Sequence, residues 1–380
     1  MNDFNTEISR QTITINGKTY TADDARATAG CFSRLQILFR KPAESDNFLA
    51  SLADFLTEWF NDEDTVSVHT SGSTGTPKKL YVEKRRMMKS AMLTVSFLRL
   101  HHGDTALLCM PLKYIAGKMV VVRALVAGLD LIPITPCGHP FQQLDIHPTF
   151  AALIPMQVFN SLQVPEECER MKAVDQLIIG GGAIDPTIVQ ALQTFPNNIW
   201  STYGMTETLS HIALRKLNGK GASEWYTPLE NVTLSQSDEG TLVIDAPWVC
   251  PERLTTNDIV VFNASGQFRV IGRKDNTINT GGVKVQIEQI EAILQPLLPL
   301  PFMVTSVPDV KFGERVVLLV QACGTSLPDN EQKKFDKAFQ YLPAYWVPKQ
   351  IILTDKLPLT ETGKPDRAKA KRIASDTNTP

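Results

Sequence analysis

Two hydrophobic periods alternate along the first half of the chain. Between residues 64 and 202, apolar runs of four to six residues are typical of buried strands. They are separated by stretches whose apolar residues recur every three or four positions, as on one face of a helix. This alternation predicts an α/β layer around a largely parallel sheet. The expected strands are 65–69, 105–110, 129–134, 150–154, 176–179 and 198–202, and the expected helices are 82–100, 116–127, 155–163 and 186–194.

Two further elements are expected near the start of the chain. Residues 11–20 alternate between polar and apolar and contain Asn16-Gly17, which predicts a β-hairpin. Residues 46–60 carry apolar groups at helical spacing. Asp46 is the expected N-cap of that helix, because its carboxylate can accept a bond from a free backbone N–H.

The pattern changes after residue 228. Short apolar runs up to residue 272 are separated by turns such as Asp-Glu-Gly and Ala-Ser-Gly, which predicts a small antiparallel β region. Beyond it we expect a helix at 287–294, a strand at 316–323 and a helix near 329–341. The polar segment 273–276 separates the expected β region from these later elements. We therefore expect a large α/β domain, 1–272, with mostly parallel sheets and the small β region, and a small α+β domain, 273–380.

Composition and charge narrow the class of protein. Of the 380 residues, 43% are hydrophobic and 21% are charged, ordinary values that exclude a disordered or collagen-like chain. With 38 basic and 40 acidic side chains, the net charge of -2 gives no sign of a nucleic-acid-binding surface. The six cysteines form no CxxC pair, which argues against a disulfide scaffold and a structural zinc site.

The sequence predicts a cytoplasmic protein without a membrane span. The first residues lack the basic run and apolar stretch of a secretory signal. The longest apolar stretch, 119–134, is interrupted by Arg123 and Asp130 and is shorter than the about 20 residues that a span needs.

A glycine-rich segment, HTSGSTGTPKKL at 69–80, directly follows an expected strand. Glycine lets backbone amides approach an anion closely, serine and threonine hydroxyls add donors, and Lys78 can supply a point charge to phosphate. The spacing is not that of a Walker A loop. The density of polar donors favours a phosphate-binding loop, with an ordinary solvent-exposed loop as the alternative.

Residues 71–78 resemble the phosphate loop of the adenylate-forming superfamily, which includes acyl-CoA synthetases, nonribosomal peptide adenylation domains and firefly luciferase. Lys79 stands where glycine is usual. The resemblance implies that a carboxylate attacks the α-phosphate of ATP, giving an acyl-adenylate and pyrophosphate, and that a thiol, commonly coenzyme A, then displaces AMP. Four more segments resemble the family's motifs in the family's order: 177–186 (LIIGGGAIDP), 201–215 (STYGMTETLSHIALR), 271–291 (IGRKDNTINTGGVKVQIEQIE) and 357–367 (LPLTETGKPDR).

The resemblance implies a role for individual residues. Thr206 would donate to a phosphate, Glu207 would bind Mg²⁺, and Lys364 would be the catalytic lysine. Asp275 would be the hinge of a mobile C-terminal domain, and Gly281-Gly282 would form a loop that approaches the thiol substrate, coenzyme A. ATP would contact Thr70, Ser71, Gly72, Ser73, Thr74, Gly75, Lys78, Gly181, Gly182, Tyr203, Asp258 and Arg273.

Each of these motifs also has a structural interpretation. Asp185 and Pro186 fit a helix N-cap and first helical position, and Thr206-Glu207 fits a capping pair. Lys364 alone would be read as a solvated side chain.

Two departures from the family pattern concern the second half of the chain. Asn257 stands where the family usually has glycine, and because asparagine tolerates a positive φ we expect the turn before Asp258 to survive. A simple turn aspartate is the alternative for Asp258. Asn276 stands where the family often has a second aspartate, and residues 273–276 also fit a charged interdomain linker.

The acid substrate is suggested by residues 109–125, CMPLKYIAGKMVVVRAL, which resemble the Pro-Leu-x-His-x-x-Gly segment of o-succinylbenzoate–CoA ligases. Tyr114 stands where histidine is usual. Arg123 is a candidate to grip the second carboxylate of such a substrate, with a snorkelling arginine on an apolar helix as the alternative. His211 would line the same acyl pocket or be a structural histidine.

The leading prediction is an o-succinylbenzoate–CoA ligase of menaquinone biosynthesis, with Mg²⁺ as cofactor and with ATP, an aromatic or dicarboxylic acid and coenzyme A as partners. It leaves a homodimer open and expects no nucleic acid. Another small acyl- or aryl-CoA ligase, an amino-acid adenylating enzyme, a non-catalytic ATP-binding relative and a luciferase-like oxygenase are the alternatives.

Overall fold

The structure is a computed structural model, which describes residues 4–26, 44–69, 79–322, 324, 327–359 and 365–377. The chain forms two compact units: Met1–Thr233 with Asp245–Arg253, and Leu234–Ile244 with Leu254–Pro380. The small β region is thus grouped with the C-terminal residues. The expected domain boundary after residue 272 stays a prediction.

The first unit is built on a nine-stranded sheet with the order β11-β10-β9-β8-β7-β5-β6-β1-β2. From β9 to β1 the neighbouring strands are parallel, and the pairs at both edges are antiparallel. The α/β prediction is therefore confirmed. The strands are β1 (Thr12–Ile15), β2 (Lys18–Thr21), β5 (Thr105–Leu108), β6 (Asp130–Pro133), β7 (Phe150–Leu153), β8 (Gln176–Ile179), β9 (Asn198–Gly204), β10 (His211–Lys216) and β11 (Thr227–Pro228).

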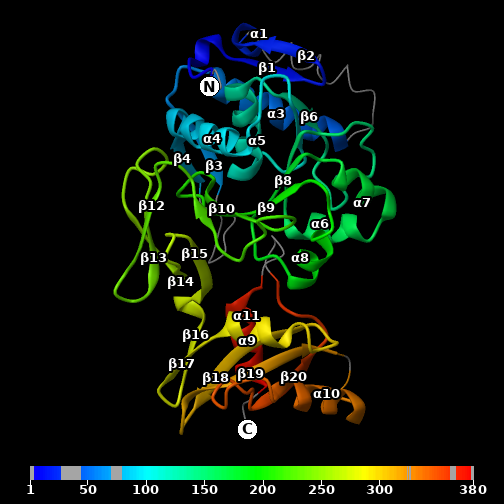
Figure 1. The fold of residues 1–380 in the computed structure, drawn as a ribbon, viewed down its shortest axis with the longest axis vertical. Coiled ribbons are helices and arrows are strands. Elements are labelled where there is room, and N and C mark those ends of the chain that lie inside the picture. The colour runs from blue at the N-terminus through cyan, green and yellow to red at the C-terminus, as the bar shows by residue number, and fades with distance from the viewer. Residues whose placement is uncertain are drawn as a thin grey trace. The chain divides into compact units, whose positions relative to one another are not determined.

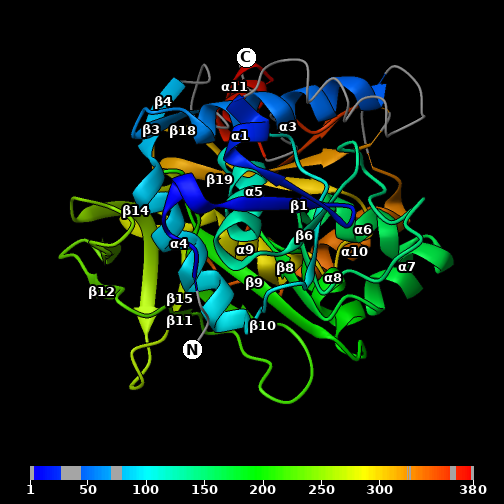
Figure 2. The same ribbon diagram turned by 90° about the horizontal axis from the view of Figure 1, so that it is seen from above.

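Helices cover this sheet at both flanks. Figures 1 and 2 show α6, α7 and α8 together at one flank of the first unit and α4 at the other. The helical segments are η1 (Ile8–Arg10), α1 (Ala22–Arg26), α3 (Glu44–Phe60), α4 (Lys84–Leu98), α5 (Ile115–Ala127), α6 (Pro155–Leu162), α7 (Pro165–Lys172) and α8 (Pro186–Leu192). None of the helices in the described ranges is both long and apolar enough for a bilayer.

Burial on both faces explains why the central strands read as unbroken apolar runs. All four residues of β7 are buried. Leu177 and Ile179 of β8 pack in one cluster with Val158 of α6 and Leu192 of α8, each at most 2% exposed. Burying one such side chain contributes roughly 1.5–3 kcal/mol.

Two local predictions had different outcomes. The hairpin is confirmed: β1 and β2 are joined by Asn16 (φ 48°) and Gly17 (φ 75°), the two positive φ angles of a type I′ turn. The N–H of Gly17 donates to the carboxylate of Asp130 at 2.9–3.0 Å, which ties the turn to β6. The cap at Asp46 is wrong, because α3 begins at Glu44 and Asp46 lies inside the helix.

The expected strand 65–69 exists as β3 (Thr65–His69), but it does not belong to the large sheet. It pairs antiparallel with β4 (Lys79–Glu83), a strand whose end we assigned to a helix. The physical reason is the connection. Antiparallel strands can be joined by a short segment, whereas a parallel neighbour needs a longer crossover.

The second unit contains two sheets. The predicted antiparallel region is confirmed as the sheet β12 (Thr233–Gln236), β13 (Thr241–Asp245), β14 (Leu254–Phe262) and β15 (Phe268–Arg273). The second sheet comprises β16 (Thr277–Thr280), β17 (Val283–Gln286), β18 (Phe302–Asp309), β19 (Gly313–Gln321) and β20 (Gln350–Thr354). The helical segments are η2 (Lys274–Asn276), α9 (Ile287–Leu294), α10 (Asp329–Phe339) and α11 (Arg367–Asp376).

A close approach between β9 and β10 yields a stability prediction. A Cβ added at Gly204 would clash with the carbonyl oxygen of Ser210 and lie 2.5 Å from Cα of His211, both backbone atoms that cannot rotate away. Gly204→Ala should therefore lower the free energy of unfolding by about 1–3 kcal/mol, as measured by denaturant titration. Gly182→Ala is the matched control, because no atom lies within 4 Å of its added Cβ. Equal stability of the two variants would contradict the prediction.

Candidate functional site

The carboxyl ends of β8 and β9 lie side by side, because the two strands pair in parallel with Ile179 opposite Ser201. In open parallel sheets, ligands bind beyond these strand ends. Gly181 and Gly182 follow β8 after one residue, Gly180. Gly181 adopts φ +84°, and the space where a side chain of Gly182 would point is open, so ligands can reach the backbone here.

Tyr203 lies at the end of β9, next to this glycine segment. Its half-buried ring contacts the ring of Tyr226 edge-on, with centroids 6.0 Å apart. The hydroxyl of Tyr226 is in turn 2.7 Å from Oγ of Ser201. A ring fixed in this way offers a stacking surface for a nucleobase.

The turn from β9 to β10 is held by the buried Thr208. Its hydroxyl accepts a bond from the N–H of Met205 at 3.0 Å and lies 2.8 Å from the carbonyl oxygen of Ser210. The carboxylate of Glu207 is exposed on this turn and accepts no hydrogen bond from the described residues, and Thr206 is half-buried beside it. The turn therefore presents two polar side chains on a rigid frame.

The exposed carboxylate of Glu207 fits a Mg²⁺ ligand. Mg²⁺ is usually held by one or two carboxylates together with substrate phosphates and water. Within the described ranges, no group of three or more His, Cys, Asp or Glu side chains is arranged to hold a metal ion. Mg²⁺ at Glu207 would therefore depend on phosphate oxygens for its other ligands.

Beyond this turn, the guanidinium of Arg123 is buried in the first unit, with only 2% of the residue exposed. Its Nη2 donates to Oγ of Ser210 at 2.6 Å and to Oγ1 of Thr94 at 3.2 Å. Its Nε has no acceptor, and no carboxylate of the described residues pairs with it. The snorkelling alternative is therefore wrong, because the charged end of the side chain does not reach water.

Electrostatics at Arg123 favour an anionic neighbour. Burial lowers the pKa of Arg123 to about 9, which still leaves it protonated at neutral pH. Burial, and then the positive charge of Arg123, lower the pKa of His211 well below its usual value, so His211 is neutral. A buried charge without a counterion is costly, and a bound carboxylate would offset that cost.

The structure brings together only two of the three expected acyl-pocket residues. His211 Nε2 lies 3.0 Å from Oγ1 of Thr94, which also contacts Arg123. Tyr114 is instead the N-cap residue of α5, roughly 13 Å along the helix from Arg123, and its backbone forms a bridge with His69.

Thr94 and Ser210 were missed by sequence reasoning, although both bind the guanidinium. Ser210 carried a weak signal, since it directly precedes His211 in a recognised motif. Thr94 carried none, because its place on α4 next to α5 depends on tertiary packing.

In the second unit, Arg273 joins two of the expected site residues. Its Nη1 donates to Asp258 at 3.2 Å, and its Nε and Nη2 donate to the carboxylate of Asp275 at 3.1 and 2.9 Å. The hydrogen bond to Asp275 raises the pKa of Arg273. Partial burial alone would raise the pKa of Asp275, but its bonds from Arg273 bring it below the usual value.

The expected turn at Asn257 is wrong. Asn257 lies inside β14 and has no positive φ, and Asp258 pairs with Arg273 across the antiparallel ladder. Asparagine was weighed for its tolerance of turns, yet the pairing with β15 keeps the segment extended. The register shift in this ladder comes between Ile259 and Val260.

Gly281 and Gly282 form the two-residue turn between β16 and β17, with φ angles of 60° and 81°. The N–H of Gly281 donates to the carbonyl oxygen of Phe312 at 2.8 Å. The N-cap prediction for Asp185 is confirmed in the first unit, because its carboxylate accepts from the N–H of Thr187 at 2.8 Å and Pro186 is the first helical residue.

The predicted phosphate-loop residues Thr70, Ser71, Gly72, Ser73, Thr74, Gly75 and Lys78, and the predicted catalytic Lys364, lie outside the described residues. Their roles stay predictions. The flanking structure is described: β3 ends at His69, β4 begins at Lys79, and Asp366 caps α11.

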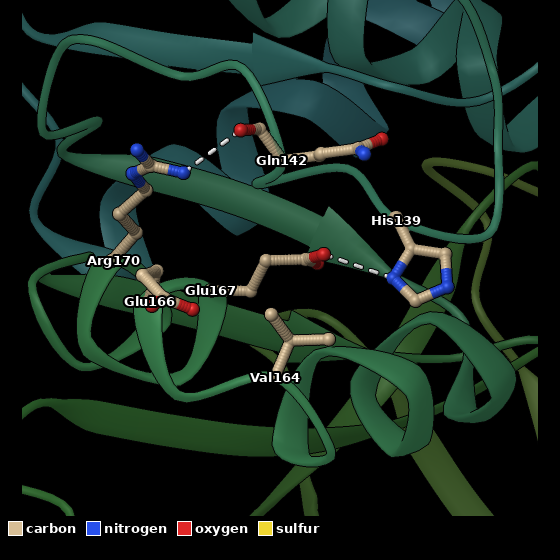
Figure 3. Close-up of a pocket in the computed structure, with 6 residues that line it drawn as sticks. All are labelled: His139, Gln142, Val164, Glu166, Glu167 and Arg170. Carbon is tan, nitrogen blue, oxygen red and sulfur yellow. Dashed lines mark hydrogen bonds and ion pairs between the residues drawn. The ribbon is translucent and has the colours of Figure 1, made fainter.

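A separate cavity of about 350 Å³ contains none of the predicted site residues. Figure 3 shows the buried carboxylate of Glu167 2.9 Å from Nδ1 of His139 and the guanidinium of Arg170 on the carbonyl oxygen of Gln142. These contacts tie the loop after β6 to α7, which gives them a structural role. The lining residues are His139, Gln142, Val164, Glu166, Glu167 and Arg170.

Comparisons with known proteins agree with this arrangement. Residues 19–245 match the family model described as AMP-binding enzyme. A probable 2-succinylbenzoate–CoA ligase of Mycobacterium tuberculosis is 27% identical over 350 residues, which cover 86% of this chain and 88% of that protein.

Two solved structures resemble the fold. The AMP-forming acyl-CoA synthetase/AMP-acid ligase II-like protein of Dyadobacter fermentans is 30% identical, with a TM-score of 0.58 over 90% of this chain and 97% of that one. The o-succinylbenzoate CoA synthetase of Bacillus subtilis, solved with its acyl-adenylate intermediate, is 19% identical, with a TM-score of 0.67 over 80% and 68%. The chain belongs to the family of AMP-binding enzymes.

Proposed function

We propose that this chain is an ATP-dependent carboxylate–CoA ligase that acts through an acyl-adenylate and takes o-succinylbenzoate as its acid. One observation carries the choice of acid: the buried guanidinium of Arg123, which has no carboxylate partner among the described residues. o-Succinylbenzoate has two carboxylates. One is adenylated, and the other needs a cation in the acyl pocket. The similarity to proteins named 2-succinylbenzoate–CoA ligases supports the same choice.

In the first half-reaction, a carboxylate oxygen forms a bond to the α-phosphorus of ATP and the bond to pyrophosphate breaks. Two anions must approach each other, so their repulsion has to be neutralised by preorganised positive charge. Thr206, Lys364, Lys78 and the amides of residues 70–75 donate to the phosphates. Glu207 would hold Mg²⁺, which would supply further charge neutralisation.

The nucleotide is held by groups that do not take part in the bond exchange. The adenine lies against Tyr203 and the backbone of Gly181 and Gly182, and the ribose hydroxyls donate to Asp258. Arg123 pairs with the distal carboxylate of the acid, while the neutral His211 and Ser210 complete the polar side of the acyl pocket. Tyr114, at the start of α5, lies too far along the helix from Arg123 to contact the distal carboxylate and takes no direct part in the proposed reaction.

In the second half-reaction, the thiolate of coenzyme A attacks the carbonyl carbon of the adenylate, and AMP leaves. We place the moving segment at 273–380, with Asp275 as the hinge. Rotation exchanges Lys364 for the turn of Gly281 and Gly282, which approaches the thiol. We also propose that the enzyme works in the cytoplasm and that its product, a CoA thioester of o-succinylbenzoate, is used in menaquinone biosynthesis.

The first test is pyrophosphate release from ATP with a panel of carboxylic acids, with and without coenzyme A. We expect selective turnover of o-succinylbenzoate to a thioester and AMP, because only this acid supplies both the reacting and the distal carboxylate. Turnover of another acid would keep the ligase chemistry and discard the menaquinone assignment. Binding of ATP without pyrophosphate release from any acid would favour a non-catalytic relative.

Arg123→Leu should discriminate between acids. Hydrogen bonds to charged groups contribute roughly 1.5–3 kcal/mol, so kcat/KM for o-succinylbenzoate should fall about 10- to 100-fold. Benzoate, which lacks the second carboxylate, should change by less than about threefold, since it makes no bond to Arg123. Steady-state kinetics with both acids measure the difference, and thermal unfolding checks that the variant folds. An equal loss with both acids would return Arg123 to a structural role.

Asp275→Pro should impair thioester formation more than adenylation, because proline fixes φ at the hinge and only the second step needs rotation. The two half-reactions are measured separately, as pyrophosphate release and as thioester yield from preformed adenylate. Asp275→Ala is the matched control: it removes the same contact with Arg273 but leaves φ free. If both variants slow both half-reactions alike, the rotation model fails.

A further inference from the structure

The strand β3 has a strand partner on one edge only. On its other edge, side chains and a loop take the place of a neighbouring strand. The N–H of Ser67 donates to Oε1 of Glu58 at 2.6 Å, and the carbonyl oxygen of Ser67 accepts from Nζ of Lys118 at 2.6 Å. The N–H of His69 donates to the carbonyl oxygen of Lys113 at 3.2 Å. The edge of β3 is thus held by α3 and by the start of α5.

Glu58 and Lys118 also bind each other. Nζ of Lys118 lies 3.0 Å from Oε2 of Glu58, and the side chains are only 8% and 28% exposed, respectively. The ammonium group lies 4.8 Å from the ring centre of Phe55, which covers it from α3. Partial burial alone would raise the pKa of Glu58, but the bonds from Ser67 and Lys118 bring it below the usual value, so Glu58 is ionised at neutral pH.

The ion pair of Glu58 and Lys118 lies close to the proposed site, so it can affect function as well as stability. The chain enters the predicted phosphate loop at Thr70, three residues after Ser67. Lys118 lies between Tyr114 and Arg123 on α5, the helix that carries the proposed acyl pocket. One ion pair therefore connects β3, just before the predicted phosphate loop, with α5, the helix that carries the proposed acyl pocket.

We infer that Glu58 and Lys118 are positioning residues that keep the ATP phosphates and the acid at a fixed separation. The inference rests on the proposed function, which assigns the loop to ATP. Neither residue touches a substrate in this account. Both act through the backbone of Ser67 on one side and through α5 on the other, and a misplacement of about 1 Å can cost about 100-fold in rate.

The two-stranded sheet of β3 and β4 has a residue suited to a matched control at its other end, away from the predicted phosphate loop. Lys84 is 2% exposed, and its Nζ donates to the carbonyl oxygen and to Oδ1 of Asn61 at 2.9 and 2.8 Å. It follows Glu83, which pairs with Thr65 at the end of the β3–β4 ribbon away from the loop. Lys84→Met therefore removes a buried lysine at the start of α4, next to the same two-stranded sheet, without touching the loop-side edge.

The experiment measures the Kd of MgATP by calorimetry for the wild type, Lys118→Met, Glu58→Gln, the double variant and Lys84→Met. We expect Lys118→Met and Glu58→Gln each to raise this Kd about tenfold, as expected of a displaced phosphate loop. The Kd of the double variant should be no higher than that of the single variant that binds MgATP more weakly, because the two residues act as one unit. Lys84→Met should lower Tm but leave the Kd within about twofold.

Loss of Tm in all three single variants with an unchanged Kd would overturn the inference and leave the pair a structural ion pair. If Lys118→Met does not fold, the nearly isosteric Glu58→Gln decides alone. The binding assay contains no acid, so it can be read even if wild-type enzyme rejects o-succinylbenzoate. Failure of the proposed acid and failure of the positioning role are thereby distinguished.

Discussion

The parallel pairing of β8 with β9 is the constraint from which the candidate site of the first unit follows. Because the two strands run in the same direction, both end at one edge, and the chain leaves them as the Gly181–Gly182 segment and as Tyr203. β9 then has to reverse into the antiparallel β10, and the turn between them carries Thr206 and Glu207. The residues proposed to bind the nucleotide and the metal ion are thus adjacent for topological reasons.

The same reversal links the turn to the acyl pocket. Ser210 ends the turn and binds the guanidinium of Arg123 on α5, and His211 begins β10, where burial and then the charge of Arg123 lower its pKa. Arg123 is therefore a buried cation that has hydroxyl partners but no anionic partner among the described residues. Burial of a charge costs several kcal/mol unless it is paired. A substrate carboxylate would supply the missing pair, so a feature that is unfavourable for folding becomes favourable for binding.

Features that depend on residues close together in the sequence could be predicted, whereas features that depend on distant partners could not. Strands such as β7 and β8 were predictable because burial on both faces leaves an unbroken apolar run. Asn16-Gly17 was predictable because its turn depends on two neighbouring residues. The sheet to which β3 belongs, and the extended backbone at Asn257, depend on distant partners, and local propensity gave the wrong answer.

The candidate site shows the same division. Tyr203 and Glu207 could be proposed from the resemblance of residues 201–215 to a family motif, but the environment of Arg123 could not be predicted. Its choice between a snorkelling and a buried position depends on α4, which supplies Thr94 from 29 residues away. Glu58 and Lys118 gave no sequence signal at all, since they are 60 residues apart and meet only because α3 and α5 flank one edge of β3.

In the second unit, competition for one guanidinium links nucleotide binding to the proposed hinge. Arg273 divides its donors between Asp258, the proposed ribose ligand, and Asp275, the proposed hinge residue. A ribose whose hydroxyls donate to Asp258 takes over lone pairs that Arg273 now uses. The guanidinium is then either retained by Asp275 or released toward a phosphate. Arg273 thus bonds to both carboxylates at once, and under the proposed function a bound nucleotide would compete for the same guanidinium.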